Sequence, residues 1–131
     1  MVRRLGLATL AILLTVTVAQ AQRGPRWEVL GQRVVTDRAD HDTITAAGKG
    51  TFTAVRFDVT GHAVDFHRVV IHFGNGGDQK VELKNTIRAG SQSRVIDIEG
   101  KDRVIRSIEF WYDAKTMGRG GKATVRAMGR N

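Results

Sequence analysis

Residues 64–77 read VDFHRVVIHFGNGG, and this stretch decides the fold. Its apolar residues alternate with polar ones in two sets, Val64 and Phe66, then Val69, Ile71 and Phe73. Alternation with a period of two is typical of a β-strand with one buried face. The offset between the two sets is odd, which indicates a β-bulge near His67 and Arg68. The Asn-Gly pair that follows tolerates positive φ angles and predicts a tight hairpin turn.

The same alternation, interrupted by glycine-containing turns, marks six more segments of the chain. They span residues 27–35, 52–59, 79–84, 94–98, 103–112 and 122–128. Seven short strands at this spacing predict an all-β fold, a single antiparallel β-sandwich of the jelly-roll or immunoglobulin-like kind. The predicted core consists of Trp27, Val29, Val55, Phe57, Val59, Phe66, Ile71, Phe73, Leu83, Ile96, Ile98, Ile108 and Phe110.

Residues 1–21 have the pattern of a secretory signal peptide. Two arginines precede an apolar run from Leu5 to Val18, and Ala19 and Ala21 supply the small residues of a cleavage site. The run of about 14 residues is shorter than the roughly 20 that a membrane-spanning helix needs. We therefore expect a periplasmic or secreted protein, with cleavage leaving a β-sandwich domain over residues 22–131 and no transmembrane segment.

The chain is basic and contains no cysteine. Its 21 Lys and Arg residues outnumber 13 Asp and Glu residues, which gives a net charge of +8 at pH 7. The absence of cysteine excludes a thiol nucleophile, a disulfide and a thiolate metal site. The basic residues are spread along the chain rather than clustered, so a nucleic-acid partner is not expected. A weaker preference for anionic partners, such as acidic glycans or lipid headgroups, remains.

One segment between the first two predicted strands concentrates ligand-binding residue types. Asp37, Asp40, His41 and Asp42 fall within six positions. The three carboxylates are oxygen ligands of the kind that calcium takes, although their order does not match an EF-hand. Alternatively, such side chains accept backbone hydrogen bonds and stabilise a turn without any ligand. The four histidines have no spacing typical of a metal site, so we expect no cofactor, with calcium as the alternative.

Five short motifs stand out along the predicted domain. They are W-x-x-L-G at residues 27–31, D-H-D-x-I at 40–44, FGNG at 73–76, RVIDI at 94–98 and RVIRSIEF at 103–110. This pattern resembles a family of small exported bacterial domains of unknown function. The resemblance covers nearly all of the chain after the leader. It implies export and an all-β fold, and it implies no activity or site residue.

No catalytic motif is recognisable in the chain. The sequence contains no serine-hydrolase elbow, and its scattered carboxylates do not identify a glycosidase pair. The glycine-rich loops at 74–78 and 118–122 do not match a phosphate-binding loop, and we expect both to be hairpin turns. The sequence thus favours a non-enzymatic envelope module that binds a polysaccharide, a protein or an anionic surface. The alternative is a hydrolase, or a calcium-dependent binding protein, that uses the segment from Asp37 to Asp42.

Overall fold

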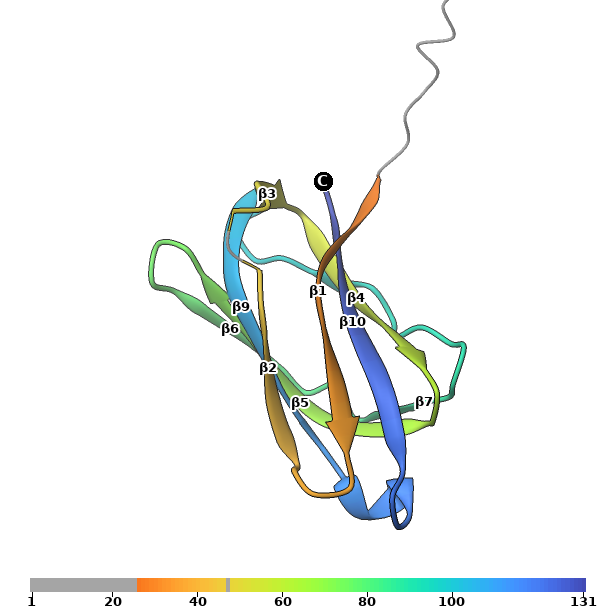
Figure 1. Cartoon of the computed structure of the whole chain (residues 1–131). Coiled ribbons are helices and arrows are strands. Elements are labelled where there is room, and N and C mark those ends of the chain that lie inside the picture. Colours follow the sequence, from red (N-terminus) through yellow and green to blue (C-terminus); the bar gives the residue numbers. More distant parts are fainter. Residues whose placement is uncertain (1–25, 47) are drawn as a thin grey trace, which may run out of the picture.

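The computed structural model describes residues 26–46 and 48–131, so the predicted signal peptide lies outside the described residues. The described residues form two antiparallel sheets packed face to face (Figure 1), which confirms the expected β-sandwich. The strands are β1 (Trp27–Thr36), β2 (His41–Thr45), β3 (Thr51–Phe52), β4 (Ala54–Thr60), β5 (Val64–Phe73), β6 (Asp78–Val81), β7 (Asn85–Ile87), β8 (Ile96–Asp97), β9 (Arg103–Tyr112) and β10 (Lys122–Arg130). A single-turn 3-10 helix, η1 (Ala114–Met117), lies between β9 and β10. Within the described ranges, no helix has the length and apolar character to cross a membrane.

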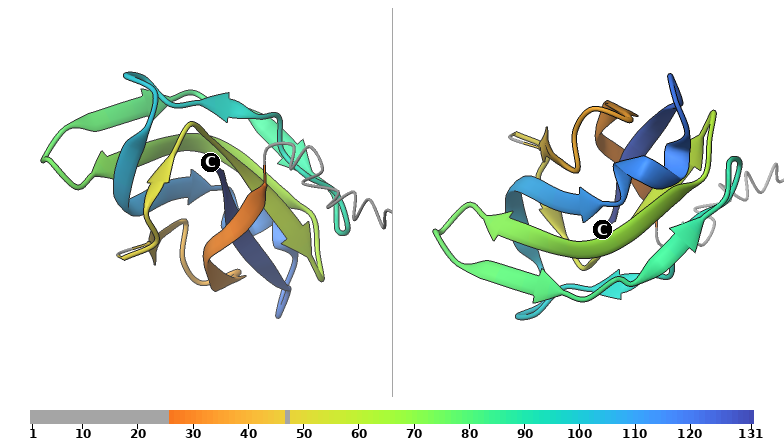
Figure 2. Two further views of the ribbon diagram at one scale, coloured as in Figure 1. Left: turned by 90° about the horizontal axis from the view of Figure 1, so that it is seen from above. Right: turned by 90° about the horizontal axis from the view of Figure 1, so that it is seen from below.

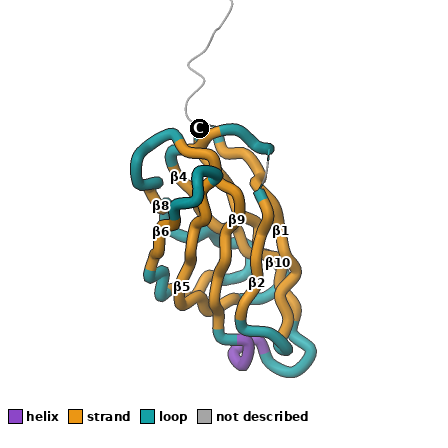
Figure 3. The backbone as a smooth tube through the Cα atoms, turned by 90° about the vertical axis from the view of Figure 1, so that its left-hand side faces the viewer, coloured by secondary structure: helices purple, strands orange, loops and turns teal. Residues whose placement is uncertain are grey.

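The first sheet has the strand order β1-β10-β4-β8, and the second has the order β2-β9-β5-β6. Two short strands extend the second sheet, since β3 also pairs with β9 and β7 also pairs with β5. Figure 2 shows the two layers end-on. Because β1 and β2 are consecutive but belong to different sheets, the turn at residues 37–40 crosses from one sheet to the other. This turn and η1 lie at the same end of the sandwich (Figure 3).

The long strands β5 and β9 form the centre of the second sheet, and their bounds agree with the sequence prediction. The predicted bulge is confirmed, because the register of β5 against β9 shifts between Phe66 and Arg68. The bulge adds one residue, His67, to the outer face. As a result His67 and His72, which lie five positions apart, are both on the outer face, whereas a regular strand would place them on opposite faces.

The core between the sheets is built around a cluster of aromatic side chains. The rings of Phe57, Phe66, Phe110 and Tyr112 pack with centroids 5.5–6.1 Å apart. Eleven of the thirteen predicted core residues are buried. They are Val55, Phe57, Val59, Phe66, Ile71, Phe73, Leu83, Ile96, Ile98, Ile108 and Phe110.

The prediction that Trp27 and Val29 belong to the core is wrong. Val29 is 44% exposed and Trp27 is half-buried, whereas Leu30 and Val35 of the same strand are buried. The register of β1 against β10 shifts between Val29 and Gly31, and this irregularity breaks the simple alternation. Trp27 instead packs under two guanidinium groups, those of Arg56 at 4.3 Å and Arg130 at 5.5 Å from its ring centroid.

Candidate functional site

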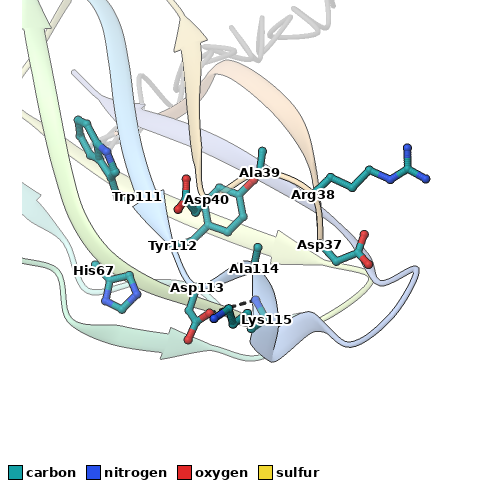
Figure 4. Close-up of a pocket in the computed structure, with 10 residues that line it drawn as sticks. All are labelled: Asp37, Arg38, Ala39, Asp40, His67, Trp111, Tyr112, Asp113, Ala114 and Lys115. Atoms are coloured by element: carbon teal, nitrogen blue, oxygen red, sulfur yellow. Dashed lines mark hydrogen bonds between the residues drawn. The ribbon is translucent and has the colours of Figure 1, made fainter.

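A hollow of about 430 Å³ lies at the end of the sandwich where the β1–β2 turn and η1 meet the second sheet (Figure 4). Side chains from four segments form its walls. They are Asp37, Arg38, Ala39 and Asp40 of the turn, His67 of the β5 bulge, Trp111 and Tyr112 at the end of β9, and Asp113, Ala114 and Lys115 at the start of η1. The hollow therefore combines one tryptophan with residues of both charges.

Backbone hydrogen bonds hold the walls of the hollow together. The N–H of Tyr112 donates to the carbonyl of Asp40 at 3.0 Å, and the N–H of Asp113 donates to the carbonyl of Asp65 at 2.8 Å. Asp113 is also the N-cap of η1, because its carboxylate accepts from the N–H of Lys115 at 3.0 Å. These contacts fix the turn, the β5 edge and η1 relative to the end of β9.

Trp111 is held between side chains of both neighbouring strands. It lies opposite His41 of β2 and opposite Arg68 of β5. The ring centroids of His41 and Trp111 are 4.6 Å apart, and the Arg68 guanidinium lies 4.0 Å from the Trp111 centroid. Aromatic and cation–π contacts of this kind restrict the indole to one position. As the alternation predicts, Tyr112 points into the core while Trp111 points outward.

Next to Trp111, a row of polar side chains crosses the outer face of the second sheet. Glu109 accepts a hydrogen bond from His41 at 2.7 Å and a second one from His72. The other ring nitrogen of His72 lies 2.6 Å from a carboxylate oxygen of Asp78. An ionised carboxylate only accepts hydrogen bonds, so two carboxylates at the two nitrogens of His72 favour the doubly protonated ring. The row links β2, β9, β5 and β6.

The row shifts the pKa values of two of its members. Burial lowers the pKa of His72, but the hydrogen bonds to Glu109 and Asp78 and the charges of these carboxylates raise it by more, so that it lies above its ordinary value. The hydrogen bonds from His41 and His72 hold the pKa of Glu109 below its ordinary value, against the effect of burial. Each partner thus stabilises the charged form of the other.

The structure keeps Asp37 and Asp40, two of the four residues that the sequence singled out, at the hollow and directs His41 and Asp42 elsewhere. Asp37 accepts a hydrogen bond from the N–H of Gly120 at 2.9 Å, and Asp40 lines the hollow. His41 lies in the row on the outer face, whereas Asp42 accepts hydrogen bonds from Arg33 at 3.2 Å and from the Tyr112 hydroxyl at 2.8 Å. The calcium and hydrolase hypotheses for this segment stay predictions.

Several residues in or beside the hollow were not among the predicted site residues. Asp65 and His67 on β5 and Asp113 after β9 have ligand atoms within 4.8 Å of one another. The pairing of β5 with β9 brings them together, and a single sequence does not show which strands pair. The predicted bulge at His67 was the available signal, because bulges often redirect a side chain next to a functional site.

A second, more basic hollow of about 610 Å³ shares Asp37 and Arg38 with the first. It is lined by Thr36, Asp37, Arg38, Arg119, Gly120, Gly121 and Lys122. The loop at residues 118–121 therefore forms part of the wall of this second hollow. It is not the hairpin turn that we expected, because it joins η1 to β10 in the opposite sheet. The loop at 74–77 is the expected hairpin between β5 and β6.

A sequence model for the family described as "Domain of unknown function (DUF2541)" matches residues 6–129. No curated protein matches the sequence. Among solved structures, AlgX of Pseudomonas aeruginosa is 13% identical with a TM-score of 0.49, over 79% of this chain and 26% of that one. A mutant of a carbohydrate binding module of family 29 is 15% identical with a TM-score of 0.38, over 82% of both chains. This chain thus spans about a quarter of the length of the AlgX chain, and similarities this distant carry no argument about function.

Proposed function

We propose that this chain, which belongs to the DUF2541 family, is an exported, non-enzymatic module that binds an acidic polysaccharide in the hollow beside η1. One observation carries the proposal: Trp111 lines the same hollow as the polar and charged residues Asp40, His67 and Lys115. A sugar ring presents apolar C–H groups next to hydroxyl groups. An aromatic wall beside charged hydrogen-bonding groups suits both, and a few such polar groups are enough to orient a ligand.

The rigidity of the aromatic wall supports a binding role. His41 and Arg68 already hold the Trp111 ring, and backbone hydrogen bonds already hold the turn and η1. A ligand therefore orders few side chains when it binds. Preorganisation of this kind improves affinity, because less conformational entropy is lost on association.

The adjoining basic hollow favours an acidic ligand. Arg38, Arg119 and Lys122 supply three cationic side chains there, and Arg38 also lines the first hollow. A polymer that extends from the first hollow into the second would meet all three. The net charge, +8 for the full sequence and +6 without Arg3 and Arg4 of the predicted leader, adds a long-range attraction for polyanions. The signal-peptide pattern supports a location outside the cytoplasm, where envelope polysaccharides occur.

The test is a comparison of two tryptophan variants. We would titrate the purified chain with acidic and neutral polysaccharides by calorimetry, and repeat the titration with Trp111→Ala and Trp27→Ala. Trp27 is a matched control, since it is also half-buried under arginine but lies on the first sheet and lines neither hollow. We expect Trp111→Ala to weaken binding at least about tenfold and Trp27→Ala to leave it unchanged. Equal affinity of all three proteins would contradict the proposal.

The preference for acidic polymers has its own test. Replacing Arg119 and Lys122 by Gln should weaken binding of an acidic polysaccharide and reduce its dependence on salt. Arg106→Gln is the control, because this exposed residue of β9 lines neither hollow. A binding constant that is insensitive to salt in the parent protein would rule out an ionic contribution from the second hollow.

A further inference from the structure

Asp65, His67 and Asp113 form a group of metal-ligand type at the rim of the hollow. One ligand atom from each lies within 4.8 Å of the other two. In residues 26–46 and 48–131, no other three His, Asp or Glu side chains converge in this way. Two of the residues come from β5 and the third follows β9, and the hydrogen bond from the Asp113 N–H to the Asp65 carbonyl fixes their separation.

The charges around this group point to a cation. Across the described ranges, Asp42, Asp58 and Asp97 form ion pairs with Arg, whereas Asp65 and Asp113 form none with Lys or Arg. Two adjacent carboxylates without such a partner repel each other, and a bound divalent ion would remove that repulsion.

The donor set fits a transition-metal ion better than calcium. One imidazole with two carboxylates is a combination that zinc accepts, whereas calcium prefers oxygen ligands alone. Ligand atoms around a tetrahedral zinc lie roughly 3.3 Å apart, because each is about 2 Å from the ion. The three side chains would move together by a small amount on binding. His67 is exposed and both aspartates are half-buried, so their side chains have room to do so.

The fourth coordination position would face the hollow, since His67 and Asp113 both line it. Three protein ligands with one open position are typical of zinc sites that bind an external ligand. We propose that Asp65, His67 and Asp113 bind a divalent transition-metal ion, zinc above all, whose open position takes an oxygen of the polysaccharide. The role of the ion in ligand binding rests on the proposed function. The positive charge of the ion would also offset the negative charge of Asp113, so that an acidic ligand could approach this wall of the hollow.

The first experiment measures zinc binding by the chain after treatment with EDTA and dialysis. Zinc is titrated by calorimetry into the parent, His67→Gln, Asp65→Asn and the control His62→Gln. Asn at position 65 still accepts the hydrogen bond that the Thr86 hydroxyl donates, so that variant keeps its local structure. We expect one zinc per chain in the parent and in the control, and at least about tenfold weaker binding in the other two variants. Absence of saturable binding in the parent, or unchanged binding by His67→Gln, overturns the proposal.

A second arm replaces zinc by calcium in thermal melting. A ligand that binds only the folded protein raises Tm. We expect zinc, and not calcium, to raise the Tm of the parent, with no increase in His67→Gln. If calcium raises the Tm of the parent and of His67→Gln but not that of Asp40→Asn, the ion is bound by the segment from Asp37 to Asp42. That result overturns the site at Asp65, His67 and Asp113.

A third arm separates this inference from the proposed function. The acidic polysaccharide is titrated in zinc and, separately, in EDTA. Affinity that falls in EDTA for the parent, and is equally low for His67→Gln in both buffers, supports the role of the ion. Affinity that is the same in both buffers keeps the proposed function and overturns that role. Zinc binding without binding of any polysaccharide supports the metal site and contradicts the proposed function.

Discussion

Tyr112 donates its hydroxyl hydrogen to the Oδ2 atom of Asp42 at 2.8 Å. Tyr112 is almost completely buried, whereas Asp42 belongs to the edge strand β2. The other carboxylate oxygen of Asp42 accepts from Arg33 of β1, at 3.2 Å. Asp42 therefore connects the two strands that flank the turn of the hollow, and Tyr112 attaches that connection to the core.

The first prediction concerns this hydrogen bond. Tyr112→Phe removes the hydroxyl and leaves one oxygen of a mostly buried carboxylate without its donor. We expect the free energy of unfolding to fall by about 1.5–3 kcal/mol, the contribution typical of a hydrogen bond to a charged group. Urea denaturation measures the change. Arg33→Ala is the comparison, and it should cost less, because the Arg33 side chain is 57% exposed and the pair is screened by solvent.

The second prediction is a dependence of stability on pH. The pKa of His72 is raised, so its contribution is complete below the ordinary value of 6.5 and is lost as the pH rises through its folded-state pKa. The pKa of Glu109 is lowered, so its contribution is complete above the ordinary value of 4.5 and is lost as the pH falls through its folded-state pKa. We expect the urea midpoint to be highest between these two values.

The groups that face His72 define the control for this prediction. Glu109 of β9 and Asp78 of β6 contact its two ring nitrogens, and His41 of β2 contacts Glu109 in turn. His72→Gln should lower the urea midpoint more at pH 5.5 than at pH 8, and so flatten the profile. His62→Gln should keep the profile of the parent. If the urea midpoint of the parent rises from pH 5.5 to pH 8, the row of His41, Glu109, His72 and Asp78 does not determine how stability depends on pH.

The long strands were predictable because their alternation coincides with complete burial of one face. Val64 and Phe73 begin and end such a pattern in β5, and β9 has the same property. Strands β2 and β7 were not predicted, since each buries a single apolar residue, Ile44 and Ile87 respectively. Their hydrogen-bonding partners lie far away in the sequence, so local alternation carries too little information to identify them.

The site was predictable only in part, for reasons of strand geometry. Neighbouring residues in a strand point to opposite faces, so His41 and Asp42 separate although they are adjacent in sequence. Conversely, His67 and Asp113 come together because β5 and β9 pair in a particular register. The proximity of residues 37–42 in the sequence thus indicated a single cluster, which the fold divides. The pairing of β5 with β9 creates the group of Asp65, His67 and Asp113, which no local sequence pattern reveals.

The third prediction concerns Ser93, which the sequence did not single out. Its hydroxyl oxygen accepts from the N–H of Phe57 at 2.8 Å, and the hydroxyl donates to the carbonyl of Arg94 at 2.8 Å. Ser93 is 7% exposed, so Ser93→Ala leaves a buried N–H without its acceptor. We expect a loss of about 1–3 kcal/mol in unfolding free energy by urea denaturation. The control Ser91→Ala, at an exposed turn residue, should cost less than about 0.5 kcal/mol.

The fourth prediction joins stability to the hollow through Gly121. A Cβ atom at this position would lie 2.1 Å from the carbonyl oxygen of Met117, which is backbone of η1 and has no rotamer to adopt. Gly121→Ala therefore displaces η1, whose first residues line the hollow. We expect a loss of about 1–3 kcal/mol in unfolding free energy together with weaker polysaccharide binding.

The comparison for this variant is Arg126→Ala, at an exposed residue of β10 that lines neither of the two hollows at η1. It should change the unfolding free energy by less than about 0.5 kcal/mol and leave polysaccharide binding unaltered. Urea denaturation and calorimetric titration of the same samples measure both quantities. If Gly121→Ala lost stability but bound the polysaccharide like the parent, the ligand would not contact η1, and the binding surface would have to be placed elsewhere on the sandwich.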